Sequence, residues 1–140
     1  MDKNTILYPM LGQVLLTVVV WVWMYITRLG TMMRLHISPQ ELADPKGKAR
    51  LQGVAGPSDN LSNLFETPLL FYVALLTIYV TNQVDQVFSL LAWSFVLLRC
   101  LHSFIHCSNN RVLHRFVAYL LSSLILFIIW ARIALALLSV

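Results

Sequence analysis

Four long apolar segments dominate the chain, and each is long enough to cross a lipid bilayer as a helix. A hydrocarbon core about 30 Å thick requires about 20 predominantly apolar helical residues. Segments of this kind cover residues 5–27, 60–81, 87–105 and 112–138. The pattern predicts an all-α integral membrane protein in which four transmembrane helices form one bundle and residues 1–140 form a single domain.

The segments between these spans differ in their content of basic residues. The long loop over residues 28–58 holds five lysines and arginines, and the loop over 107–111 holds Arg111, with Arg115 close behind it. The short turn over 82–86 holds no lysine or arginine. Because basic loops are retained on the cytoplasmic side, loops 28–58 and 107–111 are predicted to be cytoplasmic, and both termini are predicted to lie on the opposite side.

Composition agrees with a membrane location and narrows the classes of partner. Hydrophobic residues make up 59% of the 140 residues and charged residues only 11%, whereas about a quarter of a soluble domain is charged. The net charge of +4 lies in the loops rather than in a basic arm, so we expect membrane lipid as a partner and no nucleic acid. Because four short helices enclose little space, an oligomer is the natural way to build a ligand pocket.

The second span carries polar residues where it begins. Asn63 and Glu66 are three residues apart, which places both on one face of a continuous helix. Pro68 cannot donate a hydrogen bond to the carbonyl of Leu64, so we expect a mild kink or a free carbonyl at this point.

A denser polar cluster joins the third span to the fourth. Its members are Arg99, His102 and His106 on one helical face, followed by Arg111, Arg115 and Tyr119 on another. The topology brings both rows to the same side of the membrane as Asn63 and Glu66. Arginine binds carboxylates through paired hydrogen bonds, and charged groups inside a span usually have a function. The cluster therefore predicts a site for a small polar, anionic molecule.

Other interpretations of these residues remain open. Arg111 and Arg115 could serve only to retain their loop on the cytoplasmic side. Glu66 could form a buried structural ion pair with Arg99, and Asn63 could hydrogen-bond to a neighbouring helix.

A metal or haem site is a further alternative. His102 and His106 have the spacing of metal ligands, and Cys107 and His114 lie close in the sequence. The sequence contains no HExxH or CxxC motif, and arginines crowd the cluster. We therefore predict no metal ligands.

The motifs in the second and third spans resemble those of the MAPEG family, the membrane-associated proteins of eicosanoid and glutathione metabolism. The family's second-span motif, Asn-x-x-Glu-x-x-x-x-Phe, corresponds to Asn63, Glu66 and Phe71. Its third-span motif, Arg-x-x-His/Tyr-x-x-x-Tyr, corresponds to Arg99, His102 and His106. In prostaglandin-synthase-type members, two arginines and a tyrosine follow at the positions of Arg111, Arg115 and Tyr119. The sequence resembles a bacterial-type member over nearly its whole length.

The resemblance implies a homotrimer of four-helix subunits that binds glutathione between neighbouring subunits, in the cytoplasmic half of the membrane. Glutathione would be the co-substrate, and a lipophilic small molecule would enter from the lipid. Arg115 is implied as the catalytic group, because a fixed cation stabilises a thiolate. The residues implied in glutathione binding are Asn63, Glu66, Arg99, His102, His106, Arg111 and Tyr119.

The chain departs from the family pattern at several positions. His106 replaces the usual third-span tyrosine, Phe116 follows Arg115 where some members have serine, and Asp59 and Ser62 replace arginines that commonly precede the asparagine. Our first hypothesis is a glutathione-dependent membrane enzyme, of transferase or peroxidase type, acting on lipophilic electrophiles. The alternatives are a non-catalytic trimeric membrane protein that binds an anionic ligand or lipid headgroup, and a histidine-based metal or haem site.

Overall fold

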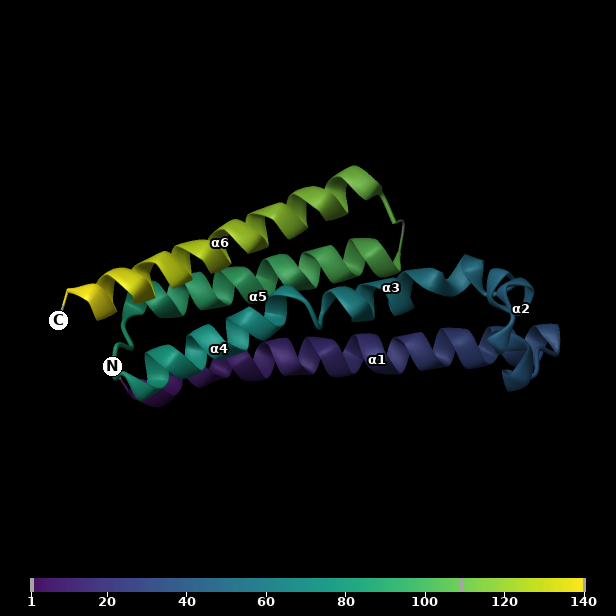
Figure 1. Cartoon of the computed structure of the whole chain (residues 1–140), viewed down its shortest axis with the longest axis horizontal. Coiled ribbons are helices and arrows are strands. Elements are labelled where there is room, and N and C mark those ends of the chain that lie inside the picture. The colour runs from purple at the N-terminus through teal and green to yellow at the C-terminus, as the bar shows by residue number, and fades with distance from the viewer. Residues whose placement is uncertain (1, 109, 140) are drawn as a thin grey trace.

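The computed structural model describes residues 2–108 and 110–139, so Asn109, which belongs to the predicted loop over 107–111, lies outside the described residues. Four long helical segments lie side by side (Figure 1), and no described residue is in a strand. The four segments that are long and apolar enough to cross a membrane are Lys3–Leu35, Gln52–Val80, Gln86–Cys107 and Val112–Leu138. These features confirm the predicted all-α integral membrane protein with four transmembrane helices.

Nine helical elements follow one another along the described residues, with the short ones gathered mainly between α1 and α3. In order they are η1 (Lys3–Ile6), α1 (Leu7–Leu35), η2 (Pro39–Ala43), α2 (Pro45–Ala49), η3 (Gln52–Val54), α3 (Ala55–Asn63), α4 (Thr67–Val80), α5 (Gln86–Cys107) and α6 (Val112–Leu138). Figure 1 shows both termini and the α4–α5 turn at one end of the bundle. The α1–α3 connection and the α5–α6 turn lie at the other end, so the two basic loops share one end.

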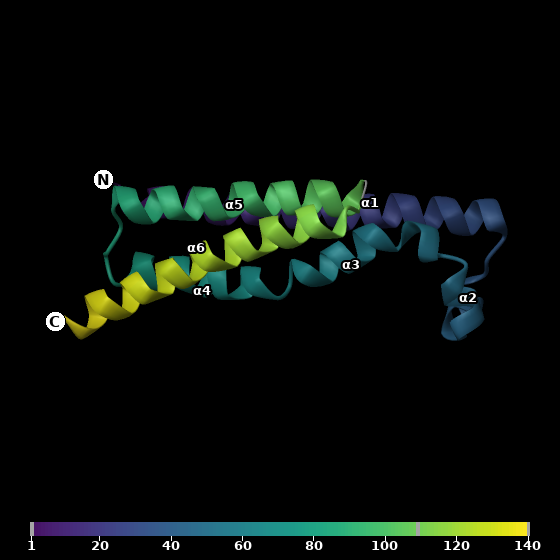
Figure 2. The same cartoon turned by 90° about the horizontal axis from the view of Figure 1, so that it is seen from above.

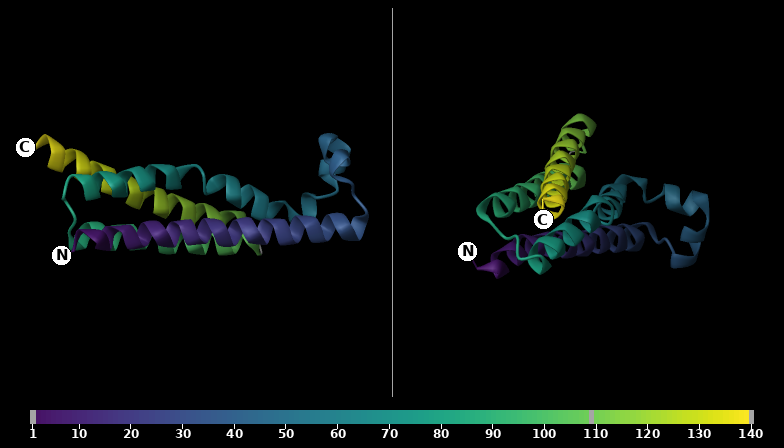
Figure 3. Two further views of the ribbon diagram at one scale, coloured as in Figure 1. Left: turned by 90° about the horizontal axis from the view of Figure 1, so that it is seen from below. Right: turned by 60° about the vertical axis from the view of Figure 1, so that its left-hand side comes forward.

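The first helix is longer than the predicted span over 5–27, because α1 continues to Leu35. His36 ends it by adopting a left-handed conformation with φ 51°, and its N–H bonds to the carbonyls of Met32 and Met33. This backbone reversal closes a helix by satisfying its last carbonyls. The predicted loop over 28–58 therefore begins as a helical extension, which Figure 3 shows reaching past the other long helices.

The predicted span over 60–81 is divided into two helices, an interruption larger than the mild kink that was one of the two expectations at Pro68. Pro68 lies in the first turn of α4, where a missing N–H is tolerated, and it cannot donate the hydrogen bond to the carbonyl of Leu64 that a continuous helix would require. The N–H of Leu69 bonds to the carbonyl of Glu66 at 3.1 Å. Asn63 ends α3 and Glu66 precedes α4, so they do not share one helical face as predicted.

The apolar core lies in the half of the bundle nearest the termini. Phe71 of α4 stacks on Phe95 of α5 with ring centroids 4.3 Å apart, and both side chains are fully buried. Leu126 and Ile129 of α6 close the same cluster. Large apolar side chains also cover the outside of the long helices, as expected for surfaces that face lipid.

Helix α6 is inclined to α5 rather than parallel to it (Figure 2). It packs mainly on α5, and it also contacts α4. Near the C-terminal end of α6, Arg132 forms a two-pronged ion pair with Asp85, and one of the two hydrogen bonds is 2.8 Å long. This pair ties the α4–α5 turn to α6, at the end of the bundle opposite the polar cluster.

Candidate functional site

The polar side chains that the sequence places on one face of α5 are buried together. Arg99 is fully buried, and His102 and His106 are each only 3% exposed. They face the N-terminal half of α6 and the end of α3, because α5 contacts both elements. The predicted shared face of these three residues is therefore present, in the half of the bundle away from the apolar core.

Arg99 links α5 to the break in the second span. Its Nη2 donates a 2.7 Å hydrogen bond to the backbone carbonyl of Asn63. Its guanidinium carbon lies 5.5 Å from the ring centroid of Tyr119 on α6, a distance typical of a cation–π contact. Its Nε and Nη1 are buried and have no partner among the described residues. A buried guanidinium with unused N–H donors is well suited to bind an anionic group.

Glu66 lies near this arginine but does not pair with it. Its side chain is exposed, and the ion pairs within residues 2–108 and 110–139 are Glu41–Arg50 and Asp85–Arg132. The buried structural ion pair between Glu66 and Arg99 that the sequence allowed is therefore not formed. The carboxylate of Glu66 remains available to a ligand or a neighbouring subunit.

His102 holds the backbone of α6. Its Nδ1 lies 2.9 Å from the carbonyl oxygen of Arg115. A carbonyl can only accept, so Nδ1 carries the hydrogen. The imidazole ring also packs against the Tyr119 ring at 5.8 Å and the His106 ring at 5.5 Å. His102 thus aligns the turn of α6 that presents Arg115 and Tyr119.

Arg115 points back from α6 toward α5. Its Nη1 donates to Nε2 of His106 at 3.0 Å and to Oδ1 of Asn110 at 2.7 Å. The side chain is only partly buried, so its remaining N–H groups are accessible. The structure therefore brings Arg99, His102, His106, Arg115 and Tyr119 into one cluster between α5 and α6.

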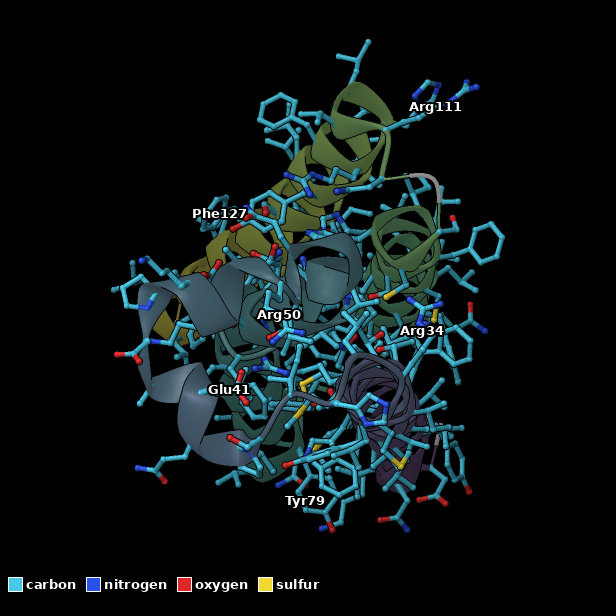
Figure 4. All side chains as sticks on the ribbon, turned by 90° about the vertical axis from the view of Figure 1, so that its right-hand side faces the viewer. Arg34, Glu41, Arg50, Tyr79, Arg111 and Phe127 are labelled. Carbon is cyan, nitrogen blue, oxygen red and sulfur yellow. The ribbon has the colours of Figure 1, made fainter. Side chains whose placement is uncertain are left out.

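Arg111 and the side chain of Asn63 lie outside the polar cluster between α5 and α6 that the sequence predicted them to join. Arg111 is exposed at the start of α6, and Figure 4 shows it at the outer margin of the bundle. It lines a shallow groove with Phe104 and His114 on the outside of the α5–α6 hairpin. Asn63 meets Arg99 through its backbone carbonyl rather than its amide side chain.

Sequence reasoning missed a second polar contact between α3 and α5. Asn60 is fully buried, its Oδ1 accepts from Oγ of Ser103 at 3.3 Å, and its Nδ2 lies 3.5 Å from Sγ of Cys107. An asparagine within an apolar span signals such a contact, because polar side chains inside membranes pair across helices. The contact of Asn110 with Arg115 was also missed, because no pattern in the sequence indicates it.

Within the described residues, no group of three or more His, Cys, Asp or Glu side chains could hold an ion. Each histidine uses one ring nitrogen for Arg115: Nδ1 of His102 contacts its backbone carbonyl, and Nε2 of His106 contacts its guanidinium. The other ring nitrogen of each, Nε2 of His102 and Nδ1 of His106, is buried without a partner among the described residues.

Comparison with known proteins identifies the family of the chain. A family model described as the MAPEG family matches residues 6–135, nearly the whole chain. No curated protein and no solved structure matches the chain. The matched region includes all four transmembrane helices and the polar cluster between α5 and α6. The chain belongs to the MAPEG family, and it is a multi-pass integral membrane protein of that glutathione- and eicosanoid-related family.

Proposed function

We propose that this protein is a glutathione-dependent membrane enzyme, of transferase or peroxidase type, that acts on lipophilic electrophiles. The observation that carries the proposal is the placement of Arg115, whose guanidinium is fixed by His106 and Asn110 while the residue remains only partly buried. Family membership supports glutathione as the thiol.

Glutathione has two carboxylates and one ammonium group, and the cluster offers groups of opposite charge. The unused Nε and Nη1 of Arg99 suit one carboxylate. The exposed carboxylate of Glu66 suits the ammonium group. Asn63, His102, His106 and Tyr119 would complete the contacts, and Arg111 would take part only from the rim.

Arg115 would activate the thiol. A free thiol has a pKa of about 8.5, so little thiolate exists at neutral pH unless a nearby cation stabilises it. The thiolate sulfur would attack an electrophilic carbon, form the C–S bond and release the leaving group with its electron pair. With a hydroperoxide it would attack the outer oxygen and break the O–O bond, which releases the alcohol after protonation and leaves a sulfenic acid on glutathione. A second glutathione would attack that sulfur, giving the disulfide and water.

We also propose that the functional unit is a homotrimer. Within one subunit, Glu66 is exposed, and Nε and Nη1 of Arg99 have no hydrogen-bond partner among the described residues. A neighbouring subunit would therefore be needed to enclose a ligand. Extensive apolar surface on the long helices is available for such contacts. Arg28 and Arg34 at the end of α1 are the cations that would reach a neighbour's site.

The proposed orientation places the basic loops in the cytoplasm. The α1–α3 connection and the α5–α6 turn lie at one end of the bundle (Figure 1), and the lysines and arginines of the loops concentrate there. Glutathione would then enter from the cytoplasm, while the lipophilic partner would enter from the membrane.

Turnover by the purified protein tests this function. Glutathione would be supplied with an aryl halide or with a lipid hydroperoxide, and product formation would be compared in the wild type and Arg115→Ala. Removing a catalytic cation should lower kcat/KM by about a hundredfold or more. Lys46→Ala, which removes an exposed cation of α2, is the matched control and should retain activity. Absence of turnover together with absence of glutathione-dependent thermal stabilisation would refute the proposal in favour of a non-catalytic protein.

A further inference from the structure

We propose that His106 is a positioning residue for Arg115 and that it makes the presentation of this arginine dependent on pH. The inference rests on the proposed function, because it concerns the arginine that would activate the thiol.

The guanidinium of Arg115 is fixed by one of its two terminal nitrogens. Nη1 carries two hydrogens, and it has two acceptors, Nε2 of His106 at 3.0 Å and Oδ1 of Asn110 at 2.7 Å. The described residues supply no acceptor for its Nε and Nη2. Because the guanidinium is planar, fixing Nη1 in two directions orients the whole group and leaves the edge formed by Nε and Nη2 for a ligand.

This arrangement requires a neutral imidazole. Arginine stays protonated and can only donate, so Nε2 of His106 must accept and the ring hydrogen must lie on Nδ1. Protonation of His106 would place a hydrogen on Nε2. It would remove the acceptor and set two positive groups about 3 Å apart, which is strongly unfavourable in a poorly hydrated site.

Few groups can compensate for such a charge. Asp59 on α3 and Arg115 on α6 are the charged groups within electrostatic range of His106. On α5 itself, the neighbouring group is His102, whose ring lies 5.5 Å away. One acidic group therefore faces at least one permanent cation and a second imidazole.

His106 also cannot withdraw from the arginine by moving its backbone. A Cβ atom at Gly56 of α3 would lie only 2.8 Å from the carbonyl oxygen of His106, so α3 packs directly on this turn of α5. On the α6 side, His102 fixes the backbone of Arg115 by a hydrogen bond to its carbonyl. A protonated His106 would consequently displace the guanidinium instead of moving away, and would weaken ligand binding.

A non-titrating replacement separates positioning from simple packing. Glutamine can present its side-chain oxygen close to the position of Nε2 and accepts at any pH, whereas leucine fills space without accepting. We would compare the wild type, His106→Gln and His106→Leu for affinity toward an S-alkyl glutathione, which has no free thiol to titrate. The measurements would run from about pH 8 to about pH 5, a range that includes the ordinary imidazole pKa of about 6.5.

The expected result is a difference in pH profile. Wild-type affinity should fall about tenfold more than that of His106→Gln on acidification, and His106→Leu should bind about tenfold more weakly at pH 8. In turnover assays, His106→Leu should change kcat more than KM. Parallel pH profiles for the wild type and His106→Gln would overturn the proposal. His106→Tyr serves as the non-titrating variant if His106→Gln does not fold.

A second measurement does not depend on function. Nitrogen NMR of the imidazole groups, with the His106 signal assigned from its loss in His106→Gln, reports which ring nitrogen carries the hydrogen. At pH 8 we expect an unprotonated Nε2 whose shift changes in Arg115→Ala. If the wild type binds no glutathione analogue, the proposed function fails, and the NMR measurement alone then tests the hydrogen bond between Arg115 and His106. A hydrogen on Nε2 of His106 at pH 8 would show that this hydrogen bond is not formed and would overturn the proposed positioning role.

Discussion

The Nη2 group of Arg99 donates a 2.7 Å hydrogen bond to the backbone carbonyl of Asn63. In an unbroken helix, the N–H of residue 67 would be the partner of that carbonyl. Here the helix ends at Asn63, and the carbonyl accepts from the buried arginine and, at 3.4 Å, from the N–H of Glu66. The break in the second span and the arginine of the third span are therefore parts of one arrangement.

Replacing Pro68 should repair the helix and weaken this arrangement. Pro68→Ala restores an N–H that can bond to the carbonyl of Leu64, so α3 and α4 should join and the Asn63 carbonyl should return to the helix. Amide hydrogen exchange over residues 64–67 should slow about five- to tenfold, because these N–H groups would enter a continuous helix. Glutathione-dependent thermal stabilisation should fall at the same time.

Pro39→Ala is the matched control for this change. Pro39 is exposed in the first turn of η2, and its replacement should leave both readouts unchanged. Unaltered exchange over residues 64–67 in Pro68→Ala would mean that something other than the proline ends α3.

Gly56 sets the distance between α3 and α5. An added Cβ would meet the carbonyl oxygen of His106 at 2.8 Å, and a backbone atom cannot move aside as a side chain can. Gly56→Ala should destabilise the protein by about 1–3 kcal/mol, measured by denaturant unfolding in detergent. At Gly53, where a Cβ would meet no atom within 4 Å, alanine should cost less than half of that. Equal stability of the two variants would show that α3 does not pack closely on α5.

The ion pair between Asp85 and Arg132 should make the fold sensitive to acid. The hydrogen bond from Arg132 holds the pKa of the Asp85 carboxyl below its ordinary value, and the N–H of Phe88 acts in the same direction. Because the folded-state pKa is depressed, the stabilisation is complete above the ordinary pKa of about 3.9 and is lost as the pH falls through the folded value. The side chains are 36% and 42% exposed, so screening limits the effect to about 1 kcal/mol.

Two substitutions of Asp85 separate its two contacts. Asp85→Asn can still accept from the N–H of Phe88, so it should remove only the acid-dependent part of the unfolding free energy. Asp85→Ala also removes the helix cap and should cost about 1 kcal/mol more at neutral pH. If the wild type and Asp85→Asn lose stability equally between pH 6 and pH 3, the ion pair does not contribute.

The number of spans and the composition of the cluster could be predicted from sequence because they follow from local patterns. Apolar length defines a transmembrane helix, and a spacing of three or four residues places Arg99, His102 and His106 on one face. The same rules failed at Asn63 and Glu66. They assume that the helix is continuous, whereas the proline in the first turn of α4 marks the start of a new one.

Other features depended on packing between segments distant in the sequence. The sequence does not indicate that Asn63 contributes a carbonyl, because any residue has one and only the helix end exposes it. Nor does it indicate that Asn110 and His106 share one nitrogen of Arg115, since this depends on the α5–α6 turn. The role of Asn60 follows from the close approach of α3 to α5, which Gly56 permits.

The ionisation state of bound glutathione tests the proposed role of Arg115 most directly. Ultraviolet difference absorbance can count thiolate when glutathione is added to the purified protein at neutral pH. We expect a thiolate signal that saturates with glutathione in the wild type, is reduced in Arg115→Lys and is absent in Arg115→Ala. An equal thiolate signal in Arg115→Ala, or none in a wild-type protein shown to bind glutathione, would contradict the assignment of Arg115 as the group that activates the thiol.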